Sequence, residues 1–229
     1  GIFTVPTSFN HYQRSWYKDL LETIGFKIKR MISEPSSAAI GYYHFYPSDI
    51  KEEHKIIVFD LGGGTTDISI LEKEEQMFQV ILNKGDLYLG GEDFTKEIQE
   101  NLKITFDQAE QRKLENNPED IILYQKTLDR LKNLIETLIT NMKKNEISLE
   151  DISDVILVGN GLKLYGIMKL LEEYFGNKIK SSPEQEYLVS YGAGILGREL
   201  SDSTSEMIMI DSTSLSIGIE TADMNFSII

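Results

Sequence analysis

The chain has 229 residues, of which 37 are acidic and 23 are basic, so its formal net charge at pH 7 is −14. This excess of negative charge argues against nucleic-acid binding over a broad basic surface, and no apolar run approaches the roughly 18 residues that a membrane span needs. Hydrophobic residues make up 41% of the chain and can form a sizeable core, whereas the absence of cysteine excludes disulfides, thiol nucleophiles and thiolate zinc sites.

The N-terminal part of the chain shows the pattern of an α/β protein. Residues 2–5 read as a strand, and Asn10 is a suitable N-cap for a helix that ends near Gly25. Residues 26–32 alternate imperfectly between apolar and basic side chains, which is typical of a second strand. Pro35 follows at a position where the first turn of a helix accepts proline. We therefore expect a strand, a helix, a strand and a helix in that order.

A glycine-containing hairpin is predicted after the polar loop at residues 48–55. Residues 55–60 form a compact apolar run that enters the glycines at 62–64, and a strand pattern resumes beyond them. Strand, glycine loop and strand together predict a hairpin. We expect a third strand over residues 77–82 and a further short strand at residues 87–89.

The remaining part of the chain is predominantly helical. Apolar side chains spaced by three and four predict helices over residues 94–114 and 121–143, separated by a turn at residues 116–118. A short buried strand at residues 154–158 precedes another helix. The later expected elements are a helix through Ile167 and Tyr174, a helix over about 187–200, and an edge-like strand over 207–220.

The segment Asp60-Leu61-Gly62-Gly63-Gly64-Thr65-Thr66-Asp67 carries the strongest chemical signal. Three consecutive glycines remove every Cβ, so the backbone can curl tightly and direct successive N–H groups at one anion. Asp60 and Asp67 bracket this phosphate cradle with two carboxylates that suit a hydrated Mg²⁺, and Thr65 adds a hydroxyl. The alternative is a glycine-rich hairpin turn flanked by solvated aspartates.

Two further motifs are weaker when taken alone. Gly159-Asn160-Gly161 follows an apolar strand and precedes a helix, an arrangement that can accept a nucleotide but that also occurs as an ordinary tight turn. Glu34 stands at a predicted helix start beside Pro35, where plain capping is the simpler interpretation. The histidines show no metal-ligand spacing; they are His11, His44 and His54.

Several segments, in order along the chain, resemble the nucleotide-binding domain of the heat shock protein 70 chaperones, within the actin and sugar-kinase ATPase superfamily. The resemblance implies an α/β chain with the actin-like ATPase (ribonuclease H-like) fold, a mixed sheet with flanking helices, of which this chain would be a partial domain. It rests on residues 5–10 with Gln13-Arg14, on Ser33-Glu34-Pro35-Ser36-Ser37-Ala38-Ala39-Ile40, on residues 60–67 and 85–94, and on Ile156-Leu157-Val158-Gly159, Tyr191-Gly192-Ala193 and Leu215-Ser216-Ile217-Gly218-Ile219-Glu220-Thr221.

The resemblance also implies roles for particular residues around ATP or ADP and Mg²⁺. The glycine loop and Thr65 would hold the β- and γ-phosphates, while Asp60, Asp67 and Glu34 would organise Mg²⁺ through its waters, with Glu34 near the attacking water. Asp60, Glu34 and Thr65 would thus be catalytic. The implied nucleotide-binding residues are Gly62, Gly63, Gly64, Thr65, Gly90, Gly91, Glu92, Gly159, Asn160, Gly161, Lys163 and Glu186.

The resemblance implies a division into three parts. Residues 1–46 would be the C-terminal part of lobe I, and residues 47–200 would be lobe II with a shortened adenine-side sub-lobe at about 92–145. Residues 201–229 would be the interdomain linker, with Met207 to Ile210 at its centre, and the first strand of a peptide-binding domain. The family's first phosphate loop and catalytic lysine would precede this chain, so an isolated copy is expected to be inactive.

The implied function is that of a chaperone that couples ATP binding and hydrolysis to the binding of unfolded polypeptides. Pro6 and Arg14 match positions that relay nucleotide state in the family, and Arg30 lies on the surface used by J-domain co-chaperones. The implied partners are unfolded polypeptides, a J-domain co-chaperone and a nucleotide-exchange factor, with no nucleic acid and no membrane. A cytoplasmic location is expected, with the endoplasmic reticulum and the mitochondrion left open.

Departures from the family's motifs keep a second interpretation open. Gly159-Asn160-Gly161-Leu162-Lys163 replaces a usual Gly-Gly-Ser-Thr-Arg, and an alignment of the preceding helical region puts Glu110 and Gln111 where basic residues normally lie. Both differences would remove contacts to the adenosine. The alternative is therefore a non-hydrolysing relative that acts as a co-chaperone or nucleotide-exchange scaffold. An actin-like filament protein or a sugar kinase is a third interpretation, which shares only the phosphate cradle.

Overall fold

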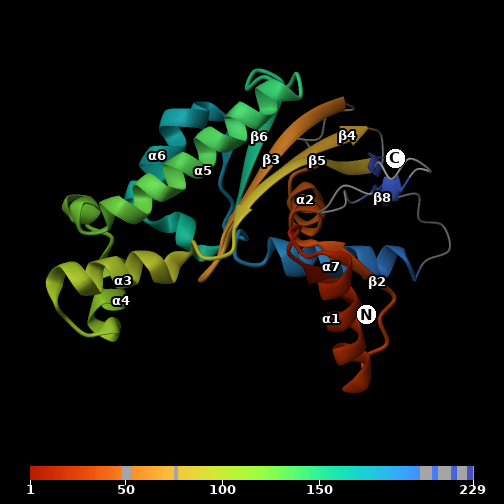
Figure 1. The fold of residues 1–229 in the computed structure, drawn as a ribbon, viewed down its shortest axis with the longest axis horizontal. Helices are drawn as coiled ribbons and strands as arrows, with labels where there is room; N and C mark the ends of the chain where they lie inside the picture. Colours follow the sequence, from red (N-terminus) through yellow and green to blue (C-terminus); the bar gives the residue numbers. More distant parts are fainter. Residues whose placement is uncertain (48–52, 75–76, 202–207, 211–217, 221–225, 229) are drawn as a thin grey trace.

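A six-stranded mixed sheet forms the centre of the computed structural model, which describes residues 1–47, 53–74, 77–201, 208–210, 218–220 and 226–228. Its strand order is β7-β6-β3-β4-β5-β8, in which β3, β4 and β5 are antiparallel and β6, β7 and β8 each run parallel to their neighbour (Figure 1). The strands are β3 (Glu53–Leu61), β4 (Thr66–Glu74), β5 (Met77–Asp86), β6 (Ile152–Val158), β7 (Ile179–Lys180) and β8 (Ile208–Ile210).

Helices cover both faces of this sheet, because successive side chains of a strand point to opposite faces. Ile57, Phe59 and Leu61 of β3 are buried in one core, while Ile56 and Val58 are buried in the other. The first core includes residues of α5 and α6 and the second includes residues of α2 and α7, and these two pairs of helices lie on opposite sides of the sheet in Figure 1. The helices are α1 (His11–Thr23), α2 (Glu34–Phe45), α3 (Gly91–Leu102), α4 (Phe106–Glu115), α5 (Gln125–Lys144), α6 (Tyr165–Phe175) and α7 (Leu188–Glu199).

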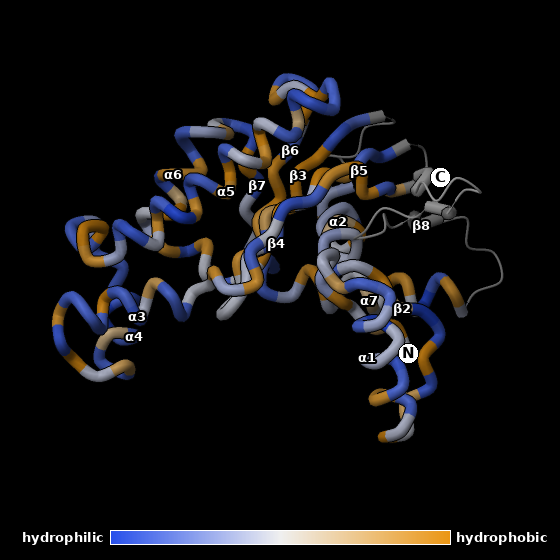
Figure 2. The backbone as a smooth tube through the Cα atoms, viewed as in Figure 1, coloured by the Kyte–Doolittle hydropathy of each residue, from blue (hydrophilic) through white to orange (hydrophobic). Residues whose placement is uncertain are grey.

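The hydropathy of the elements agrees with this layering. Strand β3 is hydrophobic over most of its length, whereas hydrophobic and hydrophilic residues alternate along α5 (Figure 2). A strand buried on both faces reads as a continuous apolar run, and a helix that covers a sheet needs only one apolar stripe. No helix within the described ranges is long and apolar enough to cross a membrane.

Smaller elements complete the fold. β1 (Ile2–Val5) pairs in parallel with β2 (Arg30–Ser33), and β9 (Gly218–Glu220) pairs antiparallel with β10 (Phe226–Ile228). Among the described residues, the 3₁₀ turns η2 (Pro118–Tyr124), η3 (Asn160–Lys163) and η4 (Gly176–Lys178) connect helices and strands. The predicted edge strand over 207–220 lies partly outside the described residues; within them, Ile208–Ile210 pairs with β5 at the edge of the sheet.

Several local expectations are confirmed. The Asn10 side chain accepts a hydrogen bond from Gln13 N at 3.0 Å and caps α1, and Pro35 lies in the first turn of α2. The turn at residues 116–118 does separate two helices, because Asn116 adopts a left-handed backbone with φ of 54° at the end of α4. The mixed sheet with flanking helices is as predicted.

Other expectations are wrong. Residues 87–89 form no strand, because β5 already includes Asp86 and the chain then turns. The helix expected over 94–114 is two helices, since Lys103 is left-handed with φ of 54° and Thr105 then caps α4. The helix expected from residue 121 begins only at Gln125, after the 3₁₀ turn η2.

Two glycines allow α2 and α7 to pack at close range. A Cβ at Gly41 would lie 2.3 Å from the carbonyl oxygen of Leu188, and one at Gly192 would lie 1.7 Å from that of Ser37. Ser37 Oγ also donates a hydrogen bond of 2.7 Å to the carbonyl oxygen of Val189. The helix that begins at Glu34 is therefore held against the helix that follows Glu186.

We predict that Gly192→Ala destabilises the chain by about 1 to 3 kcal/mol, because its methyl group would overlap the backbone of α2. Gly194→Ala is the matched control on the same helix, where an added Cβ meets no atom within 4 Å. That control should stabilise the chain by about 0.5 to 1 kcal/mol through helix propensity alone. Urea unfolding measures both; equal effects would contradict the close packing of α2 and α7.

Candidate functional site

The hairpin between β3 and β4 presents a row of backbone donors. Gly62 N donates to the carbonyl oxygen of Thr65 at 3.0 Å and closes a tight turn through Gly63 and Gly64. Within the part of the chain that the structure describes, the N–H groups of Gly63, Gly64 and Thr65 donate to no protein oxygen, and these three residues are exposed. Successive free N–H groups of this kind form an anion site.

The three glycines are not needed for a tightly curled backbone, although the sequence had suggested that they are. None of Gly62, Gly63 and Gly64 has a positive φ, and a Cβ at Gly63 or Gly64 would meet no atom of the chain within 4 Å. The turn itself therefore does not require glycine at these two positions. Space is left open in front of the free N–H groups instead, as an approaching anion would need.

The start of α3 holds the hairpin from behind. Gly91 N donates to the carbonyl oxygen of Gly62 at 2.9 Å, and Glu92 N donates to that of Gly63 at 2.7 Å. A Cβ at Gly90 would lie 2.5 Å from the backbone of Gly63 and Gly64, so only glycine fits there. The N–H groups of Gly91 and Glu92 therefore fix the position of the hairpin.

The turn after β6 packs against the end of β3. Gly159 has φ of 89°, and a Cβ there would lie 2.4 Å from the carbonyl oxygen of Leu61 and 3.1 Å from Oδ1 of Asp60. A Cβ at Gly161 would overlap the Leu61 side chain. The helix does not follow this turn directly, as had been predicted, because the 3₁₀ turn η3 intervenes before α6 begins at Tyr165.

An ion pair joins this turn to the segment before α7. Lys163 Nζ pairs with Oε1 of Glu186, and a hydrogen bond from the Asn160 side chain also reaches that carboxylate. Lys163 and Asn160 together lower the pKa of Glu186. Gln185 Nε2 donates to the carbonyl oxygen of Gly159 at 3.2 Å, so the two segments are held together at several points.

A cleft of about 670 Å³ lies between these segments and α4. Eight of the twelve residues predicted to bind a nucleotide line it, whereas Gly64, Thr65, Gly90 and Gly159 lie at its border in the same backbone segments. A volume of this size is typical of a small-molecule site. The predicted residues that line it are Gly62, Gly63, Gly91, Glu92, Asn160, Gly161, Lys163 and Glu186.

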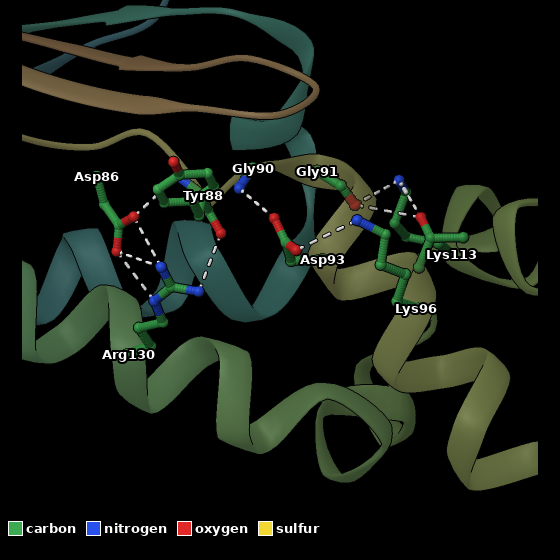
Figure 3. Close-up of polar contacts among 9 residues, drawn as sticks. Asp86, Tyr88, Gly90, Gly91, Asp93, Lys96, Lys113 and Arg130 are labelled. Atoms are coloured by element: carbon green, nitrogen blue, oxygen red, sulfur yellow. Dashed lines mark hydrogen bonds and ion pairs between the residues drawn. The ribbon is translucent and has the colours of Figure 1, made fainter.

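One wall of the cleft comes from α4, where the sequence alignment placed Glu110 near the adenosine but did not identify Lys113. Lys113 Nζ donates to the carbonyl oxygen of Gly91 at 3.0 Å (Figure 3). It also donates to Thr95 Oγ1 at 2.7 Å and pairs with Glu110 at 2.7 Å. A cation therefore faces the cleft, although the sequence alignment suggested none. The other residues of this wall are Phe106, Leu114 and Asn116.

The signal for this wall was present but incomplete. Thr105 and Gln108 form a capping box, which marks the start of a new helix and so places Phe106 in its first turn. The missing information was that this helix folds back on α3, which brings Lys113 to Gly91 across 22 positions of sequence. The spacing of apolar residues predicts a helix but does not predict against which other helix it packs.

Three carboxylates meet at the base of the hairpin, on the α2 face of the sheet. Asp60 and Asp67 are direct cross-strand partners, and Glu34 is the first residue of α2. Burial raises the pKa of Asp60 to about 7, with Glu34 and Asp67 adding to the shift. Burial and Asp67 raise the pKa of Glu34 to about 7, and burial raises that of Asp67 to about 6.

The carboxylate cluster fits a hydrated divalent cation better than a directly bound one. Among the described residues, no group of three acidic or histidine side chains is close enough to hold a metal ion by itself. Mg²⁺ commonly keeps several waters and uses few protein ligands, so carboxylates that reach it through water suit the wider spacing. The mutual repulsion of Glu34, Asp60 and Asp67 is what such a cation would relieve.

A family model described as "Hsp70 protein" matches residues 1–136 and 122–228. A chaperone protein dnaK from Cyanophora paradoxa is 31% identical over an alignment of 265 residues, which covers 96% of this chain. The chain spans 42% of the length of that relative.

We predict that Asp60→Asn makes the ligand-free chain more stable at pH 8, by on the order of 1 to 3 kcal/mol, because the variant no longer buries that charge. The folded wild type holds the Asp60 proton up to about pH 7, whereas the unfolded chain loses it near pH 4. The stability that this proton confers is therefore present below about pH 4 and lost as the pH rises to 7.

Urea unfolding from pH 4 to 8 measures this effect. The free energy of unfolding should fall less steeply with pH in Asp60→Asn than in the wild type. Asp19→Asn makes the same chemical change on an exposed surface of α1 and should leave the pH dependence unchanged. Parallel curves for the wild type and Asp60→Asn would contradict the electrostatic assignment.

Proposed function

This chain belongs to the Hsp70 family, and from that premise we propose that it binds ATP or ADP together with Mg²⁺ in the cleft bordered by the glycine hairpin. Family membership implies the actin-like ATPase fold, and the mixed sheet with helices on both faces agrees with it. The proposal concerns the ligand, its orientation and its chemistry in this particular chain.

The observation that carries the proposal is the row of free backbone donors at Gly63, Gly64 and Thr65. It stands between the cleft on one face of the sheet and the three carboxylates on the other. A ligand with an apolar body and an anionic end fits this arrangement of cleft, N–H groups and carboxylates. The body would lie against Phe106 and Leu114, and the phosphates would accept hydrogen bonds from the hairpin.

The proposed hydrolysis relies on position and charge rather than on a covalent intermediate. Asp60, Asp67 and Glu34 would hold Mg²⁺ through water, and the ion would supply neutralisation of phosphate charge. Glu34 lies at the end of a rigid helix and would orient the attacking water. The Thr65 hydroxyl is exposed at the tip of the hairpin, where it can donate to a phosphate oxygen.

The function of the whole protein is proposed by the same route. In it, nucleotide state would control the binding of unfolded polypeptides, with a J-domain co-chaperone and an exchange factor as regulators. The proposed division places lobe I at residues 1–46, lobe II at 47–200 and the linker with a first strand at 201–229. The two family matches overlap within residues 122–136, inside the sub-lobe at about 92–145 that we propose to be shortened.

A non-hydrolysing scaffold is the second candidate, and one contact favours it. Lys163 and Glu186 neutralise each other at the adenosine turn, so neither charge is free to bind a nucleotide without breaking their ion pair. A chain of this kind could retain nucleotide for stability without turnover. Binding and hydrolysis therefore need separate tests.

We predict that ADP with Mg²⁺, at about 100 times its dissociation constant, raises the free energy of unfolding by roughly 2.7 kcal/mol. For a chain of this size, that corresponds to about 5 to 10 °C in melting temperature.

Gly64→Ala should melt like the wild type without ligand, because its Cβ meets no atom within 4 Å. Its methyl group would stand beside the free N–H groups and reduce the ligand-induced stabilisation to about half, which corresponds to tenfold weaker binding.

Gly194→Ala, which is remote from the hairpin, serves as the control and should retain the full ligand-induced stabilisation. If the wild type shows no shift with ADP and Mg²⁺, nucleotide binding by this chain is refuted. If Gly64→Ala responds as strongly as the wild type, the phosphates do not lie on the hairpin.

Turnover is tested by phosphate release from ATP in the proposed whole protein, because an isolated copy of this chain is expected to be inactive under either candidate function. Asp60→Asn should reduce the rate by about 10² or more, because a carboxylate that organises the metal and its waters would be lost. Stabilisation by ADP together with undetectable wild-type turnover would support the scaffold instead. Turnover by Asp60→Asn at the wild-type rate would remove Asp60 from the mechanism.

A further inference from the structure

Arg130 on α5 clamps the turn that follows β5. Its Nε donates to Oδ2 of Asp86 at 2.9 Å, and its Nη2 lies 2.7 Å from Oδ1 and 2.6 Å from Oδ2 of the same carboxylate. Its Nη1 donates to the carbonyl oxygen of Tyr88 at 2.9 Å (Figure 3). Every hydrogen bond described for this guanidinium is therefore made to the three-residue segment 86–88.

Hydrogen bonds to Asp86 and Asp93 also hold the backbone of this turn. Tyr88 N donates to Oδ1 of Asp86 at 2.9 Å, so the carboxylate holds both the guanidinium and the backbone. Gly90 N donates to Oδ2 of Asp93 at 2.8 Å, which caps the start of α3. Figure 3 shows Asp86 directed at Arg130 of α5, and Asp93, in the first turn of α3, directed at Gly90.

The other side of the same turn rests on the phosphate hairpin. Thr66 Oγ1, at the base of the hairpin, donates to the carbonyl oxygen of Leu89 at 2.8 Å. Gly90 packs against the backbone of Gly63 and Gly64, and Gly91 N donates to Gly62. The turn at residues 86–90 is therefore held between Arg130 on one side and Thr66 with the hairpin backbone on the other.

We propose that Arg130 is a positioning residue that sets the phosphate-binding geometry of the hairpin without touching the ligand. The guanidinium links α5, which covers the sheet, to the turn that backs Gly62 and Gly63. Loss of the clamp frees the turn, and the free N–H groups then lose their fixed orientation toward an anion. This inference rests on the proposed function, because it names what tunes the same site.

The exposure of the pair separates this role from a purely stabilising one. The Arg130 side chain is 46% exposed and that of Asp86 is 23% exposed. Ion pairs at this level of exposure contribute little to global stability unless their geometry is bidentate, as it is here, so the melting temperature of each variant is measured beside its affinity. A change confined to phosphate binding, with the melting temperature nearly constant, is thus the signature of positioning.

The chain offers a matched control in Arg112. This arginine is 41% exposed and also pairs with an aspartate, Asp120, at 2.7 Å, but it makes no contact with the turn at residues 86–90. Arg112→Gln and Arg130→Gln remove the same charge from neighbouring helices. A general effect of net charge on nucleotide affinity would appear in both variants.

The test compares the affinities for adenosine and for ADP with Mg²⁺ in the wild type, Arg130→Gln, Arg130→Lys and Arg112→Gln. Arg130→Gln should weaken binding of ADP with Mg²⁺ by about 3- to 10-fold and leave adenosine binding unchanged. Arg130→Lys should recover part of the loss, since an ammonium keeps the charge but not the two-point geometry. Equal losses for adenosine and ADP, or equal effects of Arg112→Gln, would overturn the proposal.

Hydrogen exchange without nucleotide gives an independent readout. The amides of Gly91 and Glu92 donate to the hairpin, so they should exchange faster in Arg130→Gln than in the wild type or Arg112→Gln. If the wild type fails to bind ADP but these amides exchange faster in Arg130→Gln, the proposed function is wrong, whereas the role of Arg130 in positioning the hairpin still holds. If ADP binds and exchange is unchanged, Arg130 does not position the hairpin.

Discussion

Backbone segments pack directly on one another at the end of β3, and the arrangement of the candidate site depends on this contact. Gly90 lies against Gly63 and Gly64, and Gly159 lies against Leu61, at separations that exclude a Cβ at either glycine. The hairpin is thereby held from two sides by carbonyl and amide contacts rather than by mobile side chains. Its own N–H groups remain directed outward, so the anion site is built before any ligand arrives.

The carboxylate cluster adds an electrostatic cost to this geometry. Asp60 and Asp67 face each other across β3 and β4, and Glu34 approaches them from α2, so burial and mutual repulsion favour the protonated forms. The close packing of α2 on α7 through Gly41 and Gly192 prevents α2 from relaxing away. Uncompensated buried charge of this kind is destabilising in a purely structural role, and it becomes useful when a cation bridges the carboxylates to an anion.

The sequence was sufficient for features encoded locally. The hairpin, the Asn10 cap, Pro35 in the first turn of α2 and the pair of aspartates around the glycines all follow from residues close together in the chain. The hairpin, the start of α3, the turn after β6 and Glu186 were assigned to the site through the family resemblance, whereas Lys113 of α4 was not.

Features set by tertiary contacts could not be predicted in this way. Lys103 ends α3 in a left-handed backbone conformation, although glycine is the usual residue at such a position. Helix α4 then folds back along α3 and brings Lys113 into the cleft. The strand expected at residues 87–89 is a turn because Arg130 and Thr66 bind its backbone carbonyls from opposite sides. The steric need for glycine was also assigned to the wrong positions. The packing excludes a Cβ at Gly90, whereas Gly63 and Gly64 have space for one.

The pairing of β3 with β6 also determines when the site can form during folding. The two strands are neighbours in the sheet, yet Ser153 bonds to the carbonyl oxygen of Lys55 across 98 positions of sequence. The β3-β4-β5 meander can form from local contacts, whereas the turn at Gly159 reaches the hairpin only after this long loop closes. During synthesis the hairpin would emerge well before its opposite wall, so the candidate cleft would be completed only when β6 adds to the sheet.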